Sequence, residues 1–147
     1  MAEEMTPEAR RAFLTTGTRT AILATTRSDG RPHAVPVCFV LDDDVLFLTN
    51  GATVKGRALQ RDPRVTLLVD DERPPFAFVM IEGTAATSRN ADDIERVAPR
   101  IAERYDGPDG VEDFVRFARE DLGMLVRVKP TKILAFDRVS EHTDAES

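Results

Sequence analysis

Apolar and polar positions along this chain follow two periods, and the change from one to the other marks out its elements. Short runs of apolar and β-branched residues, bounded by Gly, Pro, Asn or Asp, predict β-strands. About six strands are expected, over residues 20–26, 33–41, 45–49, 64–69, 76–88 and 124–136, the last as one strand or a pair. Turn residues at 28–30 and 42–44 predict hairpins between the first three strands.

Three residues inside these elements predict local irregularities. Pro36 lacks a backbone N–H, which places its strand at a sheet edge, at a bulge, or beside something other than a partner strand. A bound flat ligand would be such a neighbour. Gly83 in the long strand predicts a β-bulge. Pro99 predicts a kink or a break in the helix expected over 92–105.

A spacing of three to four residues between apolar positions predicts helices elsewhere. Thr6 and Pro7 form a helix start within an N-terminal segment, residues 1–16, and Gly17 ends this helix. Apolar residues recur at helical spacing over 92–105 and again over 111–122. The polar segment 140–147 is expected to fray.

These elements predict a single domain, residues 1–147, of the mainly β (α+β) class. The hairpin turns favour a small antiparallel barrel with helices over its open end. A barrel of six short strands has little interior room for a ligand besides its own core. A ligand site is therefore expected on the outer wall, with a second subunit as its lid.

The composition indicates a globular chain with few residues for metal or thiol chemistry. The 147 residues are 41% hydrophobic and 31% charged, without an apolar run of the ~20 residues that span a membrane. A formal net charge of −6 argues against general nucleic-acid binding. The single cysteine, Cys38, excludes an internal disulfide, and two histidines without ligand spacing disfavour a metal site. The N-terminal segment has no apolar signal region, so a cytoplasmic location is expected.

Against this acidic background, cations are concentrated after the third strand. The stretch 45–63, VLFLTNGATVKGRALQRDP, predicts a strand, an Asn50-Gly51 turn and a helical turn that carries Lys55, Arg57 and Arg61. The two arginines are four residues apart and share a helix face. Lysine is a point charge suited to a phosphate, whereas arginine presents a planar fork to carboxylate or phosphate oxygens. The stretch predicts an anion site; the alternative is a solvated basic loop.

Three stretches in this order and spacing resemble a known family. They are AILATTRSDGRPHAVPV (21–37), VLFLTNGATVKGRALQRDPRVTLLV (45–69) and IEG (81–83). Over residues 13–136 the chain is similar to the pyridoxamine-phosphate-oxidase-like split β-barrel flavoproteins, and within them to the deazaflavin-dependent reductases. The resemblance implies a six-stranded antiparallel split β-barrel of the FMN-binding type. It also implies a homodimer with the cofactor site at the subunit interface.

The resemblance further implies which residues bind the cofactor. The strand over 33–37 runs beside the tricyclic ring, and the next strand ends in residues that bond the ribityl chain or the phosphate. Residues 53–55 grip the phosphate with Lys55 as the cation, while Arg57, Arg61 and, as a further candidate, Arg64 suit the carboxylates of a polyglutamate tail. The candidate cofactor-binding residues are His33, Val35, Pro36, Val37, Thr49, Asn50, Thr53, Val54, Lys55, Arg57, Arg61, Phe76 and Phe78.

Two departures separate the chain from the flavin mononucleotide (FMN) oxidases of this family. Those enzymes usually carry Arg directly before the lysine, where this chain has Val54, and Arg57 is the candidate replacement. Their basic C-terminal substrate segment is replaced here by RVSEHTDAES. The resemblance therefore implies coenzyme F420 as the cofactor, with FMN as the alternative.

Few other side chains offer chemistry. Phe76 and Phe78 lie two apart on a strand and are expected to point the same way, into the core or onto a partner's cofactor. His33 is interpreted as a strand residue, and Cys38 is expected to be buried and inert. No Ser–His–Asp set or carboxylate dyad can be assembled, so no catalytic residue is assigned. Hydride transfer needs none, because the cofactor supplies the chemistry.

The expected function is hydride transfer between F420 and a small conjugated organic acceptor. One alternative is an FMN-dependent oxidoreductase of the same fold. A second is a protein that binds or stores F420 or a flavin without turnover. Haem-handling relatives exist, but the shortage of histidines makes haem a poor candidate.

Overall fold

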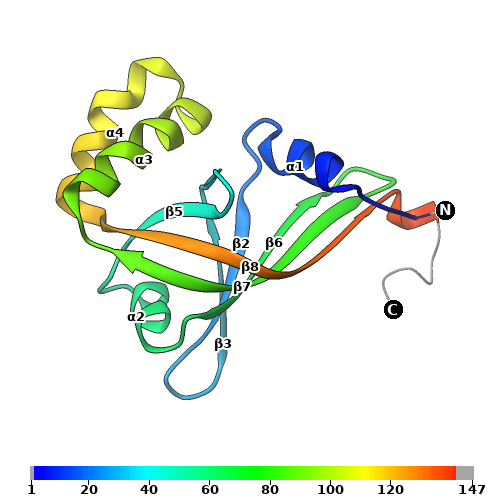
Figure 1. Ribbon diagram of the computed structural model, residues 1–147, viewed down its shortest axis with the longest axis horizontal. Coiled ribbons are helices and arrows are strands. Elements are labelled where there is room, and N and C mark those ends of the chain that lie inside the picture. The colour runs from blue at the N-terminus through cyan, green and yellow to red at the C-terminus, as the bar shows by residue number, and fades with distance from the viewer. Residues whose placement is uncertain (1, 142–147) are drawn as a thin grey trace.

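The computed structural model describes residues 2–141 and is organised around one curled antiparallel sheet (Figure 1). Its elements in chain order are β1 (Glu3–Glu4), α1 (Pro7–Thr15), β2 (Ala21–Thr26), β3 (Pro32–Val37), β4 (Val40–Leu41), β5 (Val45–Asn50), α2 (Val54–Arg61), β6 (Arg64–Asp71), β7 (Ala77–Ser88), α3 (Ala91–Tyr105), η1 (Pro108–Gly110), α4 (Val111–Phe117), η2 (Ala118–Leu122), β8 (Gly123–Asp137) and η3 (Val139–Glu141). Here η1 and η3 are 3₁₀ turns and η2 is a π-helical turn. Most of the segment expected to fray lies outside the described residues. No described helix is long and apolar enough to cross a membrane.

The sheet stays open along one seam. Its strands lie in the order β3-β2-β6-β7-β8-β5-β4, and β1 pairs with β8. β3 and β4 are consecutive in the chain yet lie at opposite ends of this order, so the sheet curls into a half-barrel that is open between them (Figure 1). The predicted number of six strands was too low, because β1 was not expected and because strand 33–41 is divided into β3 and β4.

Cys38 lies on the outward side of the strand expected over 33–41. Its neighbours Val37 and Phe39 are buried, whereas Pro36, two residues before it, is exposed, so regular alternation places Cys38 outside. Cys38 is exposed, and the prediction that it is buried was wrong. Partial burial still raises the pKa of its thiol, which is the direction expected of an unreactive cysteine.

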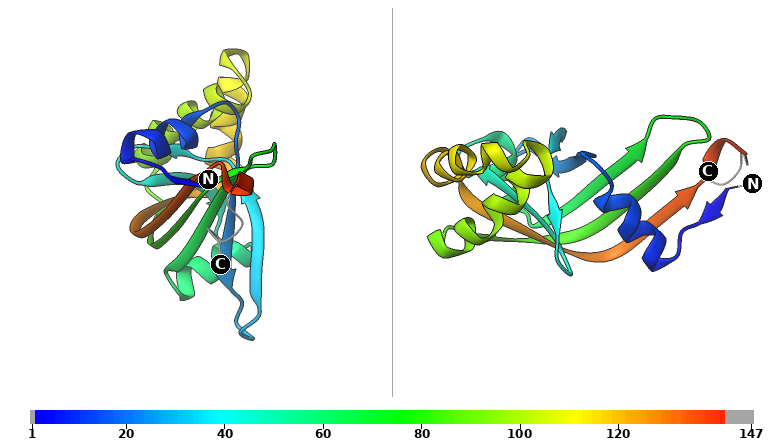
Figure 2. Two further views of the ribbon diagram at one scale, coloured as in Figure 1. Left: turned by 90° about the vertical axis from the view of Figure 1, so that its right-hand side faces the viewer. Right: turned by 90° about the horizontal axis from the view of Figure 1, so that it is seen from above.

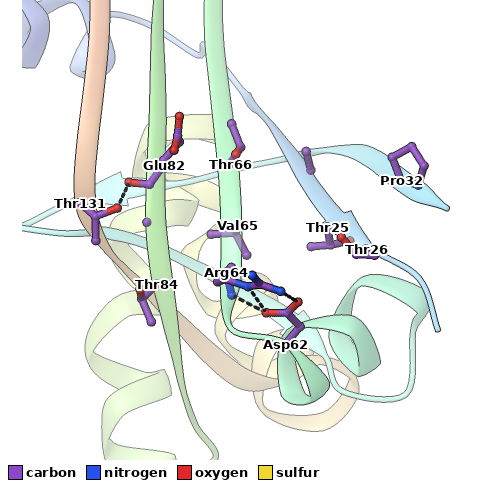
Figure 3. A pocket seen from close by; sticks show the side chains of 12 residues that line it. Thr25, Thr26, Pro32, Asp62, Arg64, Val65, Thr66, Glu82, Thr84 and Thr131 are labelled. Atoms are coloured by element: carbon purple, nitrogen blue, oxygen red, sulfur yellow. Dashed lines mark hydrogen bonds and ion pairs between the residues drawn. The ribbon is translucent and has the colours of Figure 1, made fainter. Parts of the chain in front are cut away.

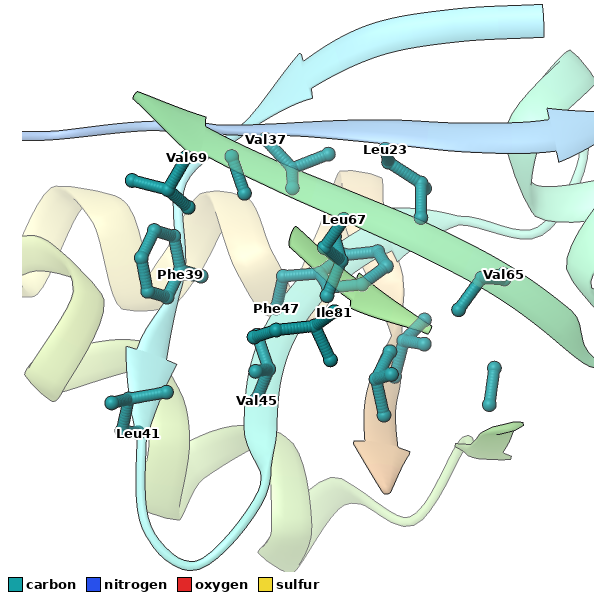
Figure 4. Close-up of a cluster of buried hydrophobic side chains, with 14 of the residues drawn as sticks. Leu23, Val37, Phe39, Leu41, Val45, Phe47, Val65, Leu67, Val69 and Ile81 are labelled. Atoms are coloured by element: carbon teal, nitrogen blue, oxygen red, sulfur yellow. The ribbon is translucent and has the colours of Figure 1, made fainter. Parts of the chain in front are cut away.

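Two apolar layers lie on the two faces of the sheet. The inner face encloses the main core, to which β2, β5 and β6 contribute Leu23, Phe47 and Leu67 (Figure 4). A second cluster, which includes Leu46 and Ile101, joins the outer face of β4, β5 and the first part of β8 to α3 and α4. The helix pair therefore covers one half of the outer face.

α3 and α4 lie over one end of the sheet (Figure 2), and the other half of the outer face, on β2, β3, β6 and β7, contributes no residue to this second cluster. The strand register aligns Pro36, Ile22, Leu68, Met80 and Leu134 across β3, β2, β6, β7 and β8. We call these five residues the outer row. Leu68 and Leu134 are 38% and 37% exposed, although both are large and apolar.

The predicted irregularities have separate outcomes. Pro36 lies in β3 at the end of the sheet, so its edge placement is confirmed. The bulge is confirmed by a register shift between Glu82 and Gly83. A Cβ at Gly83 would lie 2.7 Å from the Lys129 carbonyl oxygen, so glycine is needed for this close strand approach. Pro99 does not break α3, because the buried apolar face of the helix continues on both sides of it.

Candidate functional site

The segment that joins β5 to α2 is held in place by its own side chains. Thr53 is the N-cap of α2: its hydroxyl accepts a hydrogen bond from the Gly56 N–H (3.1 Å) and donates one to the Asn50 carbonyl (2.7 Å). The Asn50 side chain accepts from the Ala52 N–H (2.8 Å) and donates to the Asp121 carbonyl of η2 (2.7 Å). The expected helical turn is thus a capped helix of 8 residues whose start is fixed to the end of β5.

Gly56 lets α2 pack directly on this strand end, and Gly51 leaves room for the side chain of Arg89. A Cβ at Gly56 would lie 2.2 Å from the Asn50 carbonyl oxygen, and one at Gly51 would lie 2.4 Å from the Arg89 guanidinium. Gln60 donates to the carbonyls of both glycines at 2.9 Å and accepts from Arg89 at 3.0 Å. Gly56 and Gln60 therefore form part of the frame of the site, although neither was predicted to do so.

A basic cavity lies between α2 and the turn that joins β2 to β3. Its lining residues are Arg27, Ser28, Val54, Arg57 and Arg61, and its volume is about 250 Å³. Arg61 also donates to the Thr26 carbonyl at 2.5 Å, which ties α2 to the end of β2. Arg57 and Arg61, whose spacing predicted a shared helix face, both line this cavity. Arg27 was missed because only the packing of the turn against α2 brings it there.

Lys55 lies at the start of α2 and directly follows Val54, which lines this cavity. Its side chain is half-buried and makes no hydrogen bond or ion pair with the described residues. The first N–H groups of any helix lack acceptors within the helix, and the helix dipole makes this end positive. An ammonium group next to a capped helix N-terminus is suited to bind a phosphate.

Arg64, the further candidate for the basic cluster, is engaged elsewhere. Its guanidinium donates to the two carboxylate oxygens of Asp62 at 3.0 and 2.8 Å. These hydrogen bonds lower the pKa of Asp62 from 3.8 to about 2. The positive charge of Arg64 is therefore matched by Asp62, and Arg64 does not line the basic cavity.

β3 presents one free edge to the open seam. It pairs with β2 alone, so its backbone groups on the other side have no strand partner. Along it, His33 and Val35 are half-buried, Val37 is buried and Pro36 is exposed. The Nδ1 atom of His33 is buried and has no hydrogen-bond partner among the described residues. A flat ligand along this edge would meet unpaired backbone groups.

Thr49 and Asn50, at the end of β5, are expected to bond a ligand, but Thr49 is buried and the side chain of Asn50 is hydrogen-bonded inside the protein. Thr49 is 1% exposed, and its hydroxyl has no partner within the described part of the chain. The side-chain carbonyl and amide of Asn50 are both bonded inside the protein. Ligand contacts by Thr49 and Asn50 stay predictions; in this conformation Asn50 holds the loop.

Phe76 and Phe78 do not share a strand as expected. β7 begins at Ala77, and Phe76 precedes it with a φ of 65° and 42% exposure. Phe78 lies in β7 with its ring centroid 6.1 Å from that of Phe136. Strand alternation therefore does not align these two rings, and the prediction that they share a strand was wrong, because the loop turns just before β7 begins.

A polar cleft, larger than the basic cavity, lies between β2 and β6 where these two strands separate (Figure 3). β2 and β6 pair only over Ile22–Ala24. Beyond this point they diverge, and the volume of the open cleft between them is about 550 Å³. The polar residues that line the cleft include Thr25, Thr26, Asp62, Arg64, Thr66, Glu82, Thr84 and Thr131. No group of His, Cys, Asp or Glu within residues 2–141 could hold a metal ion.

Fold and site together define a half-barrel with an anion site at the start of one helix and a free strand edge at the seam. Residues 6–135 match the pyridoxamine 5'-phosphate oxidase family, and the chain belongs to that family. No matching relative was found among curated proteins.

Solved structures share the fold. A conserved hypothetical protein of Mycobacterium tuberculosis is 27% identical, with a TM-score of 0.82 over 93% of this chain and 88% of that one. An F420 reductase is 22% identical, with a TM-score of 0.64 over 83% and 94%. The heme storage protein of Vibrio cholerae is 20% identical, with a TM-score of 0.73 over 90% and 96%. The predicted split barrel is confirmed, and the names of the last two proteins refer to different cofactors.

Proposed function

We propose that this protein binds coenzyme F420 and transfers hydride between it and a small conjugated organic acceptor. One observation carries the proposal. Three arginines line a cavity that no carboxylate lines, and Lys55, at the capped start of α2, directly follows a residue that lines the same cavity. F420, the cofactor that the family resemblance implies, carries a phosphodiester and a tail of carboxylates. A ligand with several separate negative charges matches this arrangement better than one with a single phosphate.

Each part of the site has a distinct role in this proposal. Lys55 and the first N–H groups of α2 bind the phosphate. The arginines of the basic cavity bind the acidic tail, and the free edge of β3 orients the ring. The bound deazaflavin ring supplies the hydride chemistry. The residues of the chain position it and exclude water, and none is assigned to move a proton.

We further propose that the protein acts as a homodimer that packs through the outer row. A bare sheet face with large exposed apolar side chains marks a protein interaction surface. A two-fold axis brings the same face of two copies together, and an apolar face can pack on its own copy, so a second copy is the partner that needs no other component. Phe78 is aligned with Asp70 and Phe136 beside the outer row. It would then face the second copy and its cofactor.

Two alternatives have support of their own. The family match favours an FMN-dependent oxidoreductase, in which Arg57 would be the second phosphate contact after Lys55. The lack of an assigned acid, base or nucleophile also suits a protein that binds F420 or a flavin without turnover. These alternatives differ from the leading proposal in measurable ways.

The test is a fluorescence titration of the purified protein with F420 and, separately, with FMN. Tighter binding of F420 supports the proposal, and tighter binding of FMN moves the protein to the flavin-dependent members. Reduced F420 is then mixed with quinones and enones, and its oxidation is followed by absorbance. Binding of F420 without oxidation by any acceptor would favour the non-catalytic alternative.

A further inference from the structure

The turn between β2 and β3 holds Arg27 in a defined position. The Arg27 N–H donates to the Arg31 carbonyl at 2.8 Å, and the Gly30 N–H donates to the Arg27 carbonyl at 2.9 Å. Gly30 has a φ of 88°, which glycine adopts without steric cost. Asp29 accepts from the Arg31 N–H at 3.1 Å. A turn closed by these bonds presents the Arg27 side chain to the basic cavity of α2.

The charges in the basic cavity are not matched by the protein. Arg27 and Arg57 make no side-chain hydrogen bond or ion pair with any described residue, and Arg61 bonds only the Thr26 carbonyl. Arginines nearby are paired: Arg31 lies 3.6 Å from Asp29, and Arg64 lies 2.8 Å from Asp62. With 26 acidic residues in the chain, a cavity that gathers three arginines and no carboxylate is suited to an anionic ligand.

The size of the cavity limits which part of a ligand it holds. Its volume of about 250 Å³ is below the roughly 300–1,000 Å³ of pockets that enclose a whole small molecule. It therefore suits one end of a longer ligand. Guanidinium groups bind carboxylates through planar, two-point hydrogen bonding, whereas Lys55 at the helix start suits a phosphate.

We propose that Arg27, together with Arg57 and Arg61, binds a carboxylate-bearing tail that extends from the phosphate, and that Arg27 thereby sets the preference for longer tails. This inference rests on the proposed function, since it concerns the same cofactor. Arg27 lies in the β2–β3 turn, so it would contact the tail from the side opposite α2. The affinity of the protein should then rise with the number of glutamates on F420.

The experiment compares F420 that carries several glutamates with F420 that carries none, by fluorescence titration of three proteins. The wild type should prefer the long tail by about three- to tenfold, the range of a partly exposed charge-assisted contact. Arg27→Gln should lose most of this preference yet bind the tail-free cofactor as before. Arg31→Gln is the matched control: it removes a cation from the same turn, but one that Asp29 already pairs. It should keep the wild-type preference.

The outcomes separate the two proposals. If the wild type binds neither form of F420, the proposed function fails. If it binds both forms equally, or if Arg27→Gln keeps the full preference, the proposed function stands and the role of Arg27 is overturned. Raising the salt concentration should reduce the preference of the wild type more than that of Arg27→Gln, because partly exposed charges are screened. Equal unfolding temperatures of the three proteins would show that the variants are folded.

Discussion

Replacing Gly56 by alanine tests whether the close packing of α2 on the end of β5 builds the anion site. The new Cβ would lie 2.2 Å from the Asn50 carbonyl oxygen and 2.8 Å from the Gly51 Cα. Real Cβ atoms essentially never approach another heavy atom closer than 3.0 Å. Both neighbours are backbone atoms, so neither can rotate away, and the start of α2 must move by about 1 Å to restore an ordinary contact.

Two effects of opposite sign determine the result. Alanine in place of glycine stabilises a helix by about 0.5–1 kcal/mol. Overpacking costs about 1–3 kcal/mol, and moving the helix also weakens the Thr53 cap, which contributes about 1 kcal/mol. The steric cost is larger, so we expect Gly56→Ala to lower the free energy of unfolding by about 1–3 kcal/mol. For a domain of this size, that is a fall of about 2–12 °C in Tm.

Thermal and urea unfolding measure the stability, and fluorescence titration with F420 measures the site. Gly110→Ala is the control: its φ is −93°, and the nearest atom to its new Cβ is the Asp106 Cβ at 3.1 Å. That neighbour belongs to the exposed C-cap residue of α3, and a shift of a few tenths of an ångström relieves the contact, so stability should change little. An alanine at position 56 that leaves both Tm and F420 affinity unchanged would refute the idea that this contact shapes the site.

Three further predictions concern the phosphate, the interface and acid stability. Lys55→Ala should weaken F420 binding by about 1.5–3 kcal/mol, because a hydrogen bond to a charged group is lost. Tm should stay nearly unchanged, because a surface cation adds little to folding. An unchanged affinity would show that Lys55 does not bind the phosphate. Leu68→Glu should convert a dimer to monomers in light scattering, whereas Phe117→Glu, at a side chain that is 48% exposed on α4, should not; a wild-type monomer would contradict the proposed interface. The pKa of Asp62 is lowered in the folded protein, so its pair with Arg64 stabilises the fold above pH 3.8 and this contribution is lost as the pH falls to about 2. Asp62→Asn should therefore reduce the loss of stability over that range, and an acid-unfolding curve identical to that of the wild type would count against the pair.

Local sequence patterns predicted most of the strands and helices because their causes are local. Thr53 caps α2 through a bond to a residue three positions on, and Pro36 is confined to an edge by its own missing N–H. Gly83 marks a bulge for a related reason, since any side chain there would meet the neighbouring strand. The order of motifs was sufficient to predict the split barrel, although the strand count was too low.

The sequence by itself also placed Arg57 and Arg61 together, because residues four apart on a helix share a face whatever surrounds them. Only the tertiary structure decided the rest of the basic cavity. It brought Arg27 in from the β2–β3 turn. The pairing of Arg64 with Asp62, by contrast, is a local contact between residues two apart in the sequence. The exposure of Cys38 is likewise local, because it follows from the alternation along its strand. The position of Arg27 depends on which elements pack against each other, because residues 27 and 57 are distant in the sequence and only the packing of the turn on α2 brings their side chains to one cavity.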